Sequence, residues 1–168
     1  MEAIFNRRSI RKYEDKPVEK EKIEKLLRAA MQAPSAANQQ PWEFIVVEDK
    51  EKLIKLSDAS PYSKMVANSA VTIVLLSRKE GVAFAPCIPQ DMGAAAENLL
   101  LEAANLELGA VWLGIAPVQE RMDYIKEMFG LPEGIEAFAL IPVGYPDGQK
   151  NEFVDRFDAT RVHYENWK

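Results

Sequence analysis

The run Val71-Thr72-Ile73-Val74-Leu75-Leu76 constrains the fold of this chain more than any other segment. Five of its six residues are aliphatic, and Thr72 is the single polar one. A strand with one face in water alternates polar and apolar residues, whereas a strand covered on both faces reads as a continuous apolar run. The sequence therefore predicts a central strand over residues 71–76, in a sheet that is packed on both sides.

A second apolar segment predicts a long helix from Pro89 to about Gly109, since proline is favoured in the first turn of a helix. Within it, residues 92–96 and 98–101 are small or apolar almost all the way around. Such a helix must be buried on every side. A chain of 168 residues has few places to bury it, so we expect a subunit interface to cover part of it.

The remaining segments predict short helices mixed with strands. Helices are expected over residues 2–7, over 18–31 with Pro34 as the stop, from the N-cap Asp49 to about Ser57, and from Pro117 to Gly130. Strands are expected over residues 43–48, 110–113 and 137–144. The length and the absence of repeats predict one domain spanning residues 1–168. Residues 145–168 include the aromatic side chains Phe153, Phe157, Tyr164 and Trp167, and we expect this tail to dock on another surface.

Composition narrows the classes of partner. The formal net charge of −5 repels a polyanion and predicts no nucleic-acid partner. The first six residues lack the pattern of a secretory signal, and no run is long enough to span a bilayer, so we expect no membrane partner. A single cysteine, Cys87, matches a reducing cytoplasm. With His163 as the lone histidine, no metal site is predicted.

The segment Arg7-Arg8-Ser9-Ile10-Arg11 concentrates positive charge and a hydroxyl near the N-terminus. In an extended chain Arg7, Ser9 and Arg11 point to one side, because successive side chains alternate. Guanidinium groups and a hydroxyl suit a phosphate, which accepts two parallel hydrogen bonds from one arginine. The segment is a candidate phosphate site, and a solvated basic run is the alternative.

The segment Pro34-Ser35-Ala36-Ala37-Asn38-Gln39-Gln40-Pro41-Trp42 is a polar loop between two prolines. Its amides and the Ser35 hydroxyl can donate to and accept from the edge of a heteroaromatic ring. The alternative is a surface loop after a helix stop. Taken together, the two segments suit a ligand with a phosphate end and a planar, polar-edged end, as in flavin mononucleotide (FMN).

With these segments the chain resembles the nitroreductase family of FMN-dependent oxidoreductases along nearly its whole length. Further marks of the resemblance are Gln90-Asp91 at the start of the long helix and Gly109-Ala110-Val111-Trp112-Leu113-Gly114. The resemblance implies an α+β fold with a central mixed, mostly antiparallel sheet flanked by helices. It also implies an intertwined homodimer with FMN at the subunit interface. The implied cofactor residues are Arg7, Arg8, Ser9 and Arg11 of one chain, Pro34, Ser35, Ala36 and Asn38 of the other, and Lys64, Leu113, Gly114 and Arg156.

The resemblance also implies the chemistry. NADH or NADPH would deliver hydride to flavin N5, and a small oxidised acceptor such as a nitroaromatic or a quinone would then take it, in a ping-pong sequence. No catalytic side chain is required, because the flavin carries the reaction, and Arg11 would act as an electrostatic stabiliser. Two alternatives within the same fold are reductive dehalogenation and a flavin-sequestering or sensing role.

Overall fold

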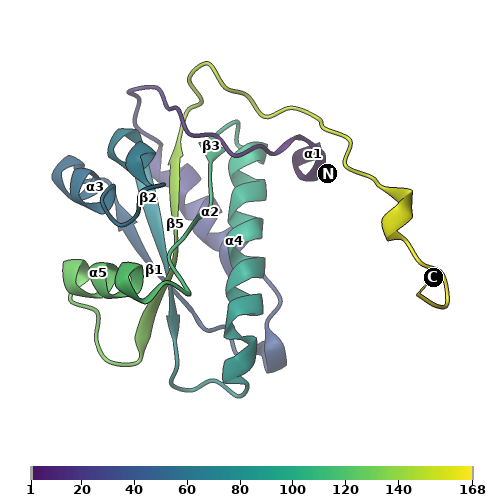
Figure 1. Cartoon of the computed structure of the whole chain (residues 1–168). Coiled ribbons are helices and arrows are strands. Elements are labelled where there is room, and N and C mark those ends of the chain that lie inside the picture. The colour runs from purple at the N-terminus through teal and green to yellow at the C-terminus, as the bar shows by residue number, and fades with distance from the viewer. Residues whose placement is uncertain (1, 168) are drawn as a thin grey trace.

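The computed structural model describes residues 2–167 and contains an antiparallel sheet with helices on both faces (Figure 1). The strands are β1 (Trp42–Val47), β2 (Val71–Arg78), β3 (Gly109–Ala110), β4 (Leu113–Gly114) and β5 (Ile135–Gly144). Their order is β1-β2-β5-β3, and β4 also pairs with β5. Every strand pair within residues 2–167 is antiparallel, and parallel pairing is confined to an isolated bridge between Ser9 and Ala110.

Two hydrophobic cores lie on opposite faces of the sheet. One contains α2 (Lys20–Met31) and α4 (Ile88–Asn105) packed against Ile73 and Leu75. The other contains α3 (Lys50–Leu56) and α5 (Gln119–Phe129) packed against Val74 and Leu76. Successive residues of β2 thus point into different cores, as the pleat of a strand requires. The expectation of a central strand covered on both faces is confirmed, since Val71–Ser77 are all buried.

Local sequence signals placed several elements well. The carboxylate of Asp49 accepts a hydrogen bond from Lys52 N at 2.9 Å and caps α3, as predicted. Gly130 ends α5 with a left-handed φ of 59°. The strand expected over residues 137–144 is β5, which begins two residues earlier at Ile135.

Other predicted boundaries are wrong. The single strand expected over residues 110–113 is split into β3 and β4, because the two pairs on β5 are separated by Val111 and Trp112. Helix α5 begins at Gln119 rather than Pro117, with Val118 as its extended N-cap residue. Helix α4 ends at Asn105, short of Gly109, and one of its sides is open within a single chain, where Glu97 is exposed.

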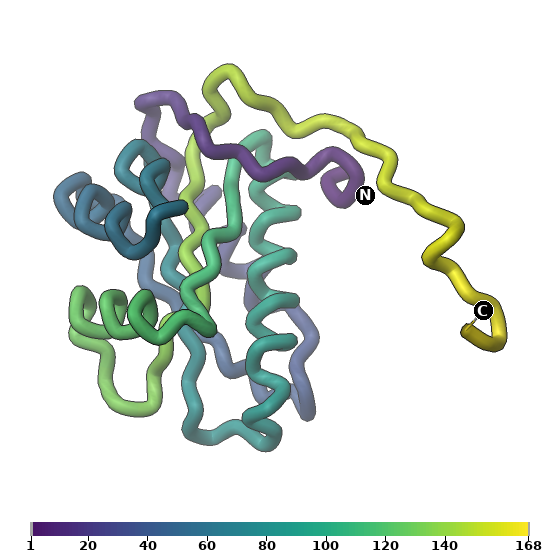
Figure 2. Tube along the Cα trace, in the orientation of Figure 1, coloured from purple at the N-terminus to yellow at the C-terminus, as the bar shows by residue number. Residues whose placement is uncertain are grey.

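Both ends of the chain leave the body on the same side (Figure 1). Helix α1 (Glu2–Asn6) lies beside α4, and the C-terminal tail extends away from the sheet (Figure 2). Of the tail aromatics, Phe153 lies near Phe5 of α1, with ring centroids 6.3 Å apart. Phe157, Tyr164 and Trp167 are 79–86% exposed, so the same chain does not provide the expected docking surface for these three. No helix within residues 2–167 has the length and apolar character needed to cross a membrane.

Candidate functional site

The basic segment is fixed to the end of the sheet through its backbone. Ile10 N donates to Ala110 O at 3.0 Å, and the Ile10 side chain is 1% exposed. Tyr13 holds the end of the segment, because its hydroxyl donates a hydrogen bond to Ile10 O at 2.7 Å. Burial raises the pKa of that hydroxyl, which keeps it a donor at neutral pH. With Ile10 turned inward, Ser9 and Arg11 on either side of it are exposed, as the alternation predicted.

The first two arginines of the segment have different surroundings. Arg7 Nε lies 3.3 Å from Glu97 Oε1 of α4, which is an ion-pair distance without hydrogen-bond geometry. Arg8 folds back on α1, donating to Phe5 O at 2.8 Å and also to Arg7 O. The Nε atoms of both arginines are buried and have no hydrogen-bond partner among residues 2–167. The segment therefore contains two donors without a hydrogen bond.

The loop after α2 has an unusual backbone. Ala37, Asn38 and Gln40 have φ values of 49°, 54° and 44°, in the left-handed region that residues other than glycine rarely adopt. Gln40 N donates to Ser35 Oγ at 3.0 Å, which closes the loop on itself. Pro34 and Asn38 are exposed at its surface. The loop is therefore a shaped element rather than a random surface connection.

One expectation about this loop is wrong. Gln39 was expected to present its amide to a ligand ring, but it is 7% exposed and turned into the protein. Its Nε2 donates to Asp91 Oδ2 at 2.6 Å, and its Oε1 accepts from Phe84 N at 2.9 Å. Ala36 N also donates to Asp91, at 2.9 Å from Oδ1. The loop is thus attached to the first turn of α4.

The predicted ring-side residues lie on the other face of the sheet. Leu113 is buried in the core with α3 and α5, and Gly114 is exposed beside it. Arg121 donates to Gly114 O at 3.0 Å. Lys64 is exposed and paired with Asp58, 2.6 Å from Nζ to Oδ1. Lys64 and Arg121 line one hollow of about 510 Å³.

The basic segment and the polar loop lie on different parts of α4 in one chain. The basic segment contacts Glu97 through Arg7 and is bound to Ala110 beyond the end of α4, whereas the loop contacts Asp91 in the first turn. Six residues separate Asp91 from Glu97, which corresponds to about 9 Å along a helix axis. Arg156 is exposed on the tail, away from both. A single chain therefore does not bring the predicted cofactor residues together.

Several residues at these segments were missed as contributors from the sequence. Asp91 was recognised only as part of a motif, and Arg78, Phe84, Glu97 and Arg121 were not singled out. The available signal was a charged residue at the start of an otherwise small and apolar helix. The partners of these side chains are distant in the sequence, so spacing alone did not reveal them.

Comparisons with known proteins agree with this architecture. The sequence profile of the nitroreductase family matches residues 4–61 and 57–145. A protein of Archaeoglobus fulgidus, named for NADH dehydrogenase and NAD(P)H nitroreductase, is 44% identical over 170 residues, covering 99% of this chain and 98% of that protein.

Two crystal structures are also similar. One, from Clostridium acetobutylicum and named as an NADH oxidase, has a TM-score of 0.97 and 58% identity, covering 98% of this chain and 99% of the other. Another, named as an FMN-dependent nitroreductase of Clostridium difficile, has a TM-score of 0.91 and 36% identity, covering 99% and 100%. The resemblance inferred from the motifs and its α+β fold are confirmed, and this chain belongs to the nitroreductase family.

Proposed function

We propose that this protein is an FMN-dependent oxidoreductase that takes hydride from NADH or NADPH and reduces a small nitroaromatic or quinone acceptor in a ping-pong sequence. Family membership supports the reaction class, and the names of similar proteins support the cofactor and the nicotinamide donor. One observation carries the cofactor assignment: two buried arginine Nε donors of the basic segment lack hydrogen-bond partners among residues 2–167.

The residues of the basic segment fit the phosphate of FMN. A phosphate offers oxygen acceptors for the unpaired Nε–H groups of Arg7 and Arg8 and for the Ser9 hydroxyl. It would also displace Glu97 from Arg7, where the ion pair lacks hydrogen-bond geometry. Arg156 is assigned to the same phosphate through the tail of one of the chains.

The remaining residues are assigned to the flavin ring. Bound FMN would supply a ring nitrogen that accepts hydride and later releases it. Arg11 has an exposed guanidinium whose position is limited by a hydrogen bond from Nη1 to Ser9 O at 3.2 Å. Its fixed charge would stabilise negative charge that accumulates on a bound ring, and Lys64 would add to this field. Leu113 and Gly114 would offer backbone to one edge of the ring. The loop residues Pro34, Ser35, Ala36 and Asn38 would hold the opposite part.

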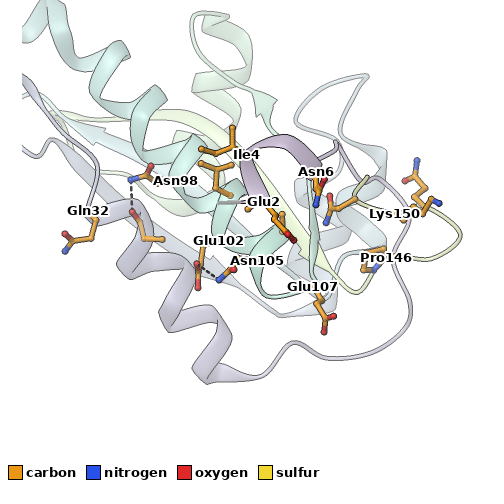
Figure 3. Close-up of a pocket in the computed structure, with 16 residues that line it drawn as sticks. Glu2, Ile4, Asn6, Gln32, Asn98, Glu102, Asn105, Glu107, Pro146 and Lys150 are labelled. Carbon is orange, nitrogen blue, oxygen red and sulfur yellow. Dashed lines mark hydrogen bonds between the residues drawn. The ribbon is translucent and has the colours of Figure 1, made fainter. Parts of the chain in front are cut away.

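We propose a homodimer because the two sets of residues are separated within one chain. The hollow of about 880 Å³ between α1, α2 and α4 is lined by Ile4, Ala29 and Leu101 together with polar residues such as Asn98 and Glu102 (Figure 3). Ile4 and Phe5 lie nearby and are 50% and 59% exposed, and the aromatic side chains of the tail are more exposed still. A second copy of the chain would cover this face and complete each site. A cytoplasmic location, with no nucleic-acid or membrane partner, belongs to the same proposal.

The visible spectrum of the purified protein tests the cofactor first. A flavin band that survives gel filtration supports the proposal, and a colourless protein that does not take up added FMN contradicts it. Anaerobic mixing with NADH and with NADPH then tests turnover: bleaching of the flavin, reversed by a nitroaromatic or quinone, is expected. A flavin that stays oxidised with both nucleotides favours sequestration, and selective turnover of halogenated phenols favours dehalogenation.

A further inference from the structure

Asp91 is a buried carboxylate that the proposed reaction does not use. It is 4% exposed, in the first turn of α4. Among residues 2–167, no lysine, arginine or histidine forms an ion pair with it. Burying a charge is costly unless hydrogen bonds replace its water. Here the positive end of α4 and two hydrogen bonds do so, one from Ala36 N at 2.9 Å and one from Gln39 Nε2 at 2.6 Å. Both donors belong to the loop that is proposed to hold the flavin.

Gln39 extends this contact to a third segment. Its Oε1 accepts from Phe84 N at 2.9 Å, and its Nε2 donates to Phe84 O at 3.2 Å as well as to Asp91. One amide therefore uses both of its ends on partners in the chain. The backbone of Phe84 is fixed in this way, while the Phe84 side chain is 56% exposed.

The loop needs this attachment because its backbone is strained. Ala37, Asn38 and Gln40 all have left-handed φ values, which persist only where the surroundings determine them. Arg78 holds the other side of the loop, donating from Nη2 to the carbonyl oxygens of Gln39 and Gln40, each at 3.0 Å. On the side of the loop that faces α4, the two carboxylate oxygens of Asp91 accept hydrogen bonds from Ala36 N and Gln39 Nε2.

We propose that Asp91 is a positioning residue, which acts through Gln39 to hold residues 34–38 in the shape that binds FMN and to fix Phe84 beside them. The proposal rests on the proposed FMN-dependent function. It predicts that the hydrogen bond between the two side chains needs one donor and one acceptor, with the residue 39 amide donating and the residue 91 carboxylate accepting. Exchanging the two chemical groups between these positions should therefore preserve the contact.

Three variants test this arrangement of donor and acceptor. In Asp91→Asn one of the two carboxylate oxygens becomes an NH2 group, which then faces a second donor, either Gln39 Nε2 or Ala36 N. Because one hydrogen bond is lost, we expect the dissociation constant of FMN to rise about tenfold. In Gln39→Glu two carboxylates face each other, and the loss should be larger. In the double variant Asp91→Asn/Gln39→Glu, the residue 91 amide donates to the residue 39 carboxylate and still accepts from Ala36 N. The bond to Phe84 O is replaced by a contact between two acceptors, whereas the bonds to residue 91, Ala36 N and Phe84 N are kept, so part of the FMN affinity should return.

The chain provides a matched control. On the exposed surface of α5, Gln119 Nε2 donates to Asp123 Oδ1 at 2.8 Å, which is the same pair in water. Asp123→Asn should leave FMN affinity and the visible flavin band unchanged. The band itself is a second readout, since a displaced loop alters the surroundings of the ring.

The outcomes separate the two proposals. If the unmodified protein does not bind FMN, the proposed function fails before any variant is made. If it binds FMN and Asp91→Asn binds equally well, or if the double variant is at least as impaired as the two single changes combined, the positioning role is wrong. Should a single variant not fold, the double variant decides: a folded double variant that retains FMN supports the role, and a double variant that is unfolded or does not bind FMN overturns it.

Discussion

Gly109 offers a sharp test of how the basic segment is attached to the sheet. A Cβ added at this position would lie 2.4 Å from Ile10 Cγ2 and 2.7 Å from Ile10 Cβ, well inside contact distance. The Ile10 side chain is 1% exposed and has no free space to turn into, and the Ile10 N–H is bound to Ala110 O. Gly109→Ala must therefore push the backbone of Ile10 away from the sheet, together with Arg7, Ser9 and Arg11.

The magnitude follows from two contributions. Overpacking a core costs about 1–3 kcal/mol, and loss of the Ile10–Ala110 hydrogen bond adds about 1 kcal/mol. We expect the free energy of unfolding to fall by about 2–4 kcal/mol. For a chain of this length about 1 kcal/mol shifts the melting temperature by about 2–4 °C, so the decrease should be about 4–16 °C. The dissociation constant of FMN should rise in parallel, because the proposed phosphate ligands move with the segment.

Gly81→Ala is the matched control, measured by the same urea and thermal unfolding. Gly81 has a φ of 69° and no neighbouring atom within 4 Å of an added Cβ, so only backbone strain of about 1 kcal/mol is expected there. In a double-mutant cycle, Ile10→Gly removes Cβ, Cγ1 and Cγ2, which are the three atoms nearest the added methyl group. The combined loss in Gly109→Ala/Ile10→Gly should then be smaller than the sum of the single losses by more than about 1 kcal/mol. A Gly109→Ala variant no less stable than Gly81→Ala would refute the reasoning.

Three further predictions concern single side chains. Arg11→Gln should make bound FMN harder to reduce, lowering its midpoint potential by about 30 mV for each 1.4 kcal/mol of lost stabilisation, and an unchanged potential removes this role. Arg7→Ala or Ser9→Ala should weaken FMN retention on gel filtration, whereas Arg28→Ala on the exposed side of α2 should not. The Glu19 pKa is lowered by a hydrogen bond from its own backbone and by one from the Tyr145 hydroxyl. The stability that comes from this lowered pKa is present at neutral pH and is lost as the pH falls through the pKa of Glu19 in the folded state. Tyr145→Phe should therefore make the midpoint of urea unfolding depend less on pH on the acid side. A dependence equal to that of the unmodified protein would contradict this prediction.

The sequence was informative where a structural signal is local. The apolar run at Val71 predicted a covered central strand, and Asp49 predicted the start of α3, because each depends on neighbours a few residues away. The split between β3 and β4 was missed, since it is imposed by the register on β5, far along the chain. The start of α5 was missed by two residues because Pro117 is equally suited to the turn before a helix.

The site shows the same division. The basic segment and the loop were found as motifs, because charge and amide content can be read directly. Their attachments were not found, because Ile10 to Ala110 and Gln39 to Asp91 are contacts across 100 and 52 residues. The burial of Gln39 could not be inferred from the sequence, because Gln39 has the same polar character as Asn38 and Gln40 beside it, and both of these are exposed. Spacing thus identified which segments matter, and only the packed structure identified which side chains hold them.

The separation of the two segments along α4 leads to a last prediction, about which chain completes each site. In a two-fold dimer the two sites are equivalent, so the basic segment of each chain would face the loop of the other. A chain with Arg7→Ala mixed with a chain carrying Asn38→Ala then forms heterodimers in which one site has both changes and the other has neither. Co-expression with two affinity tags should yield heterodimers that bind one FMN tightly per pair of chains, although each homodimer binds FMN weakly. If both segments of a site came from the same chain, every site would carry one change and no tight binding would return, which would contradict the shared site.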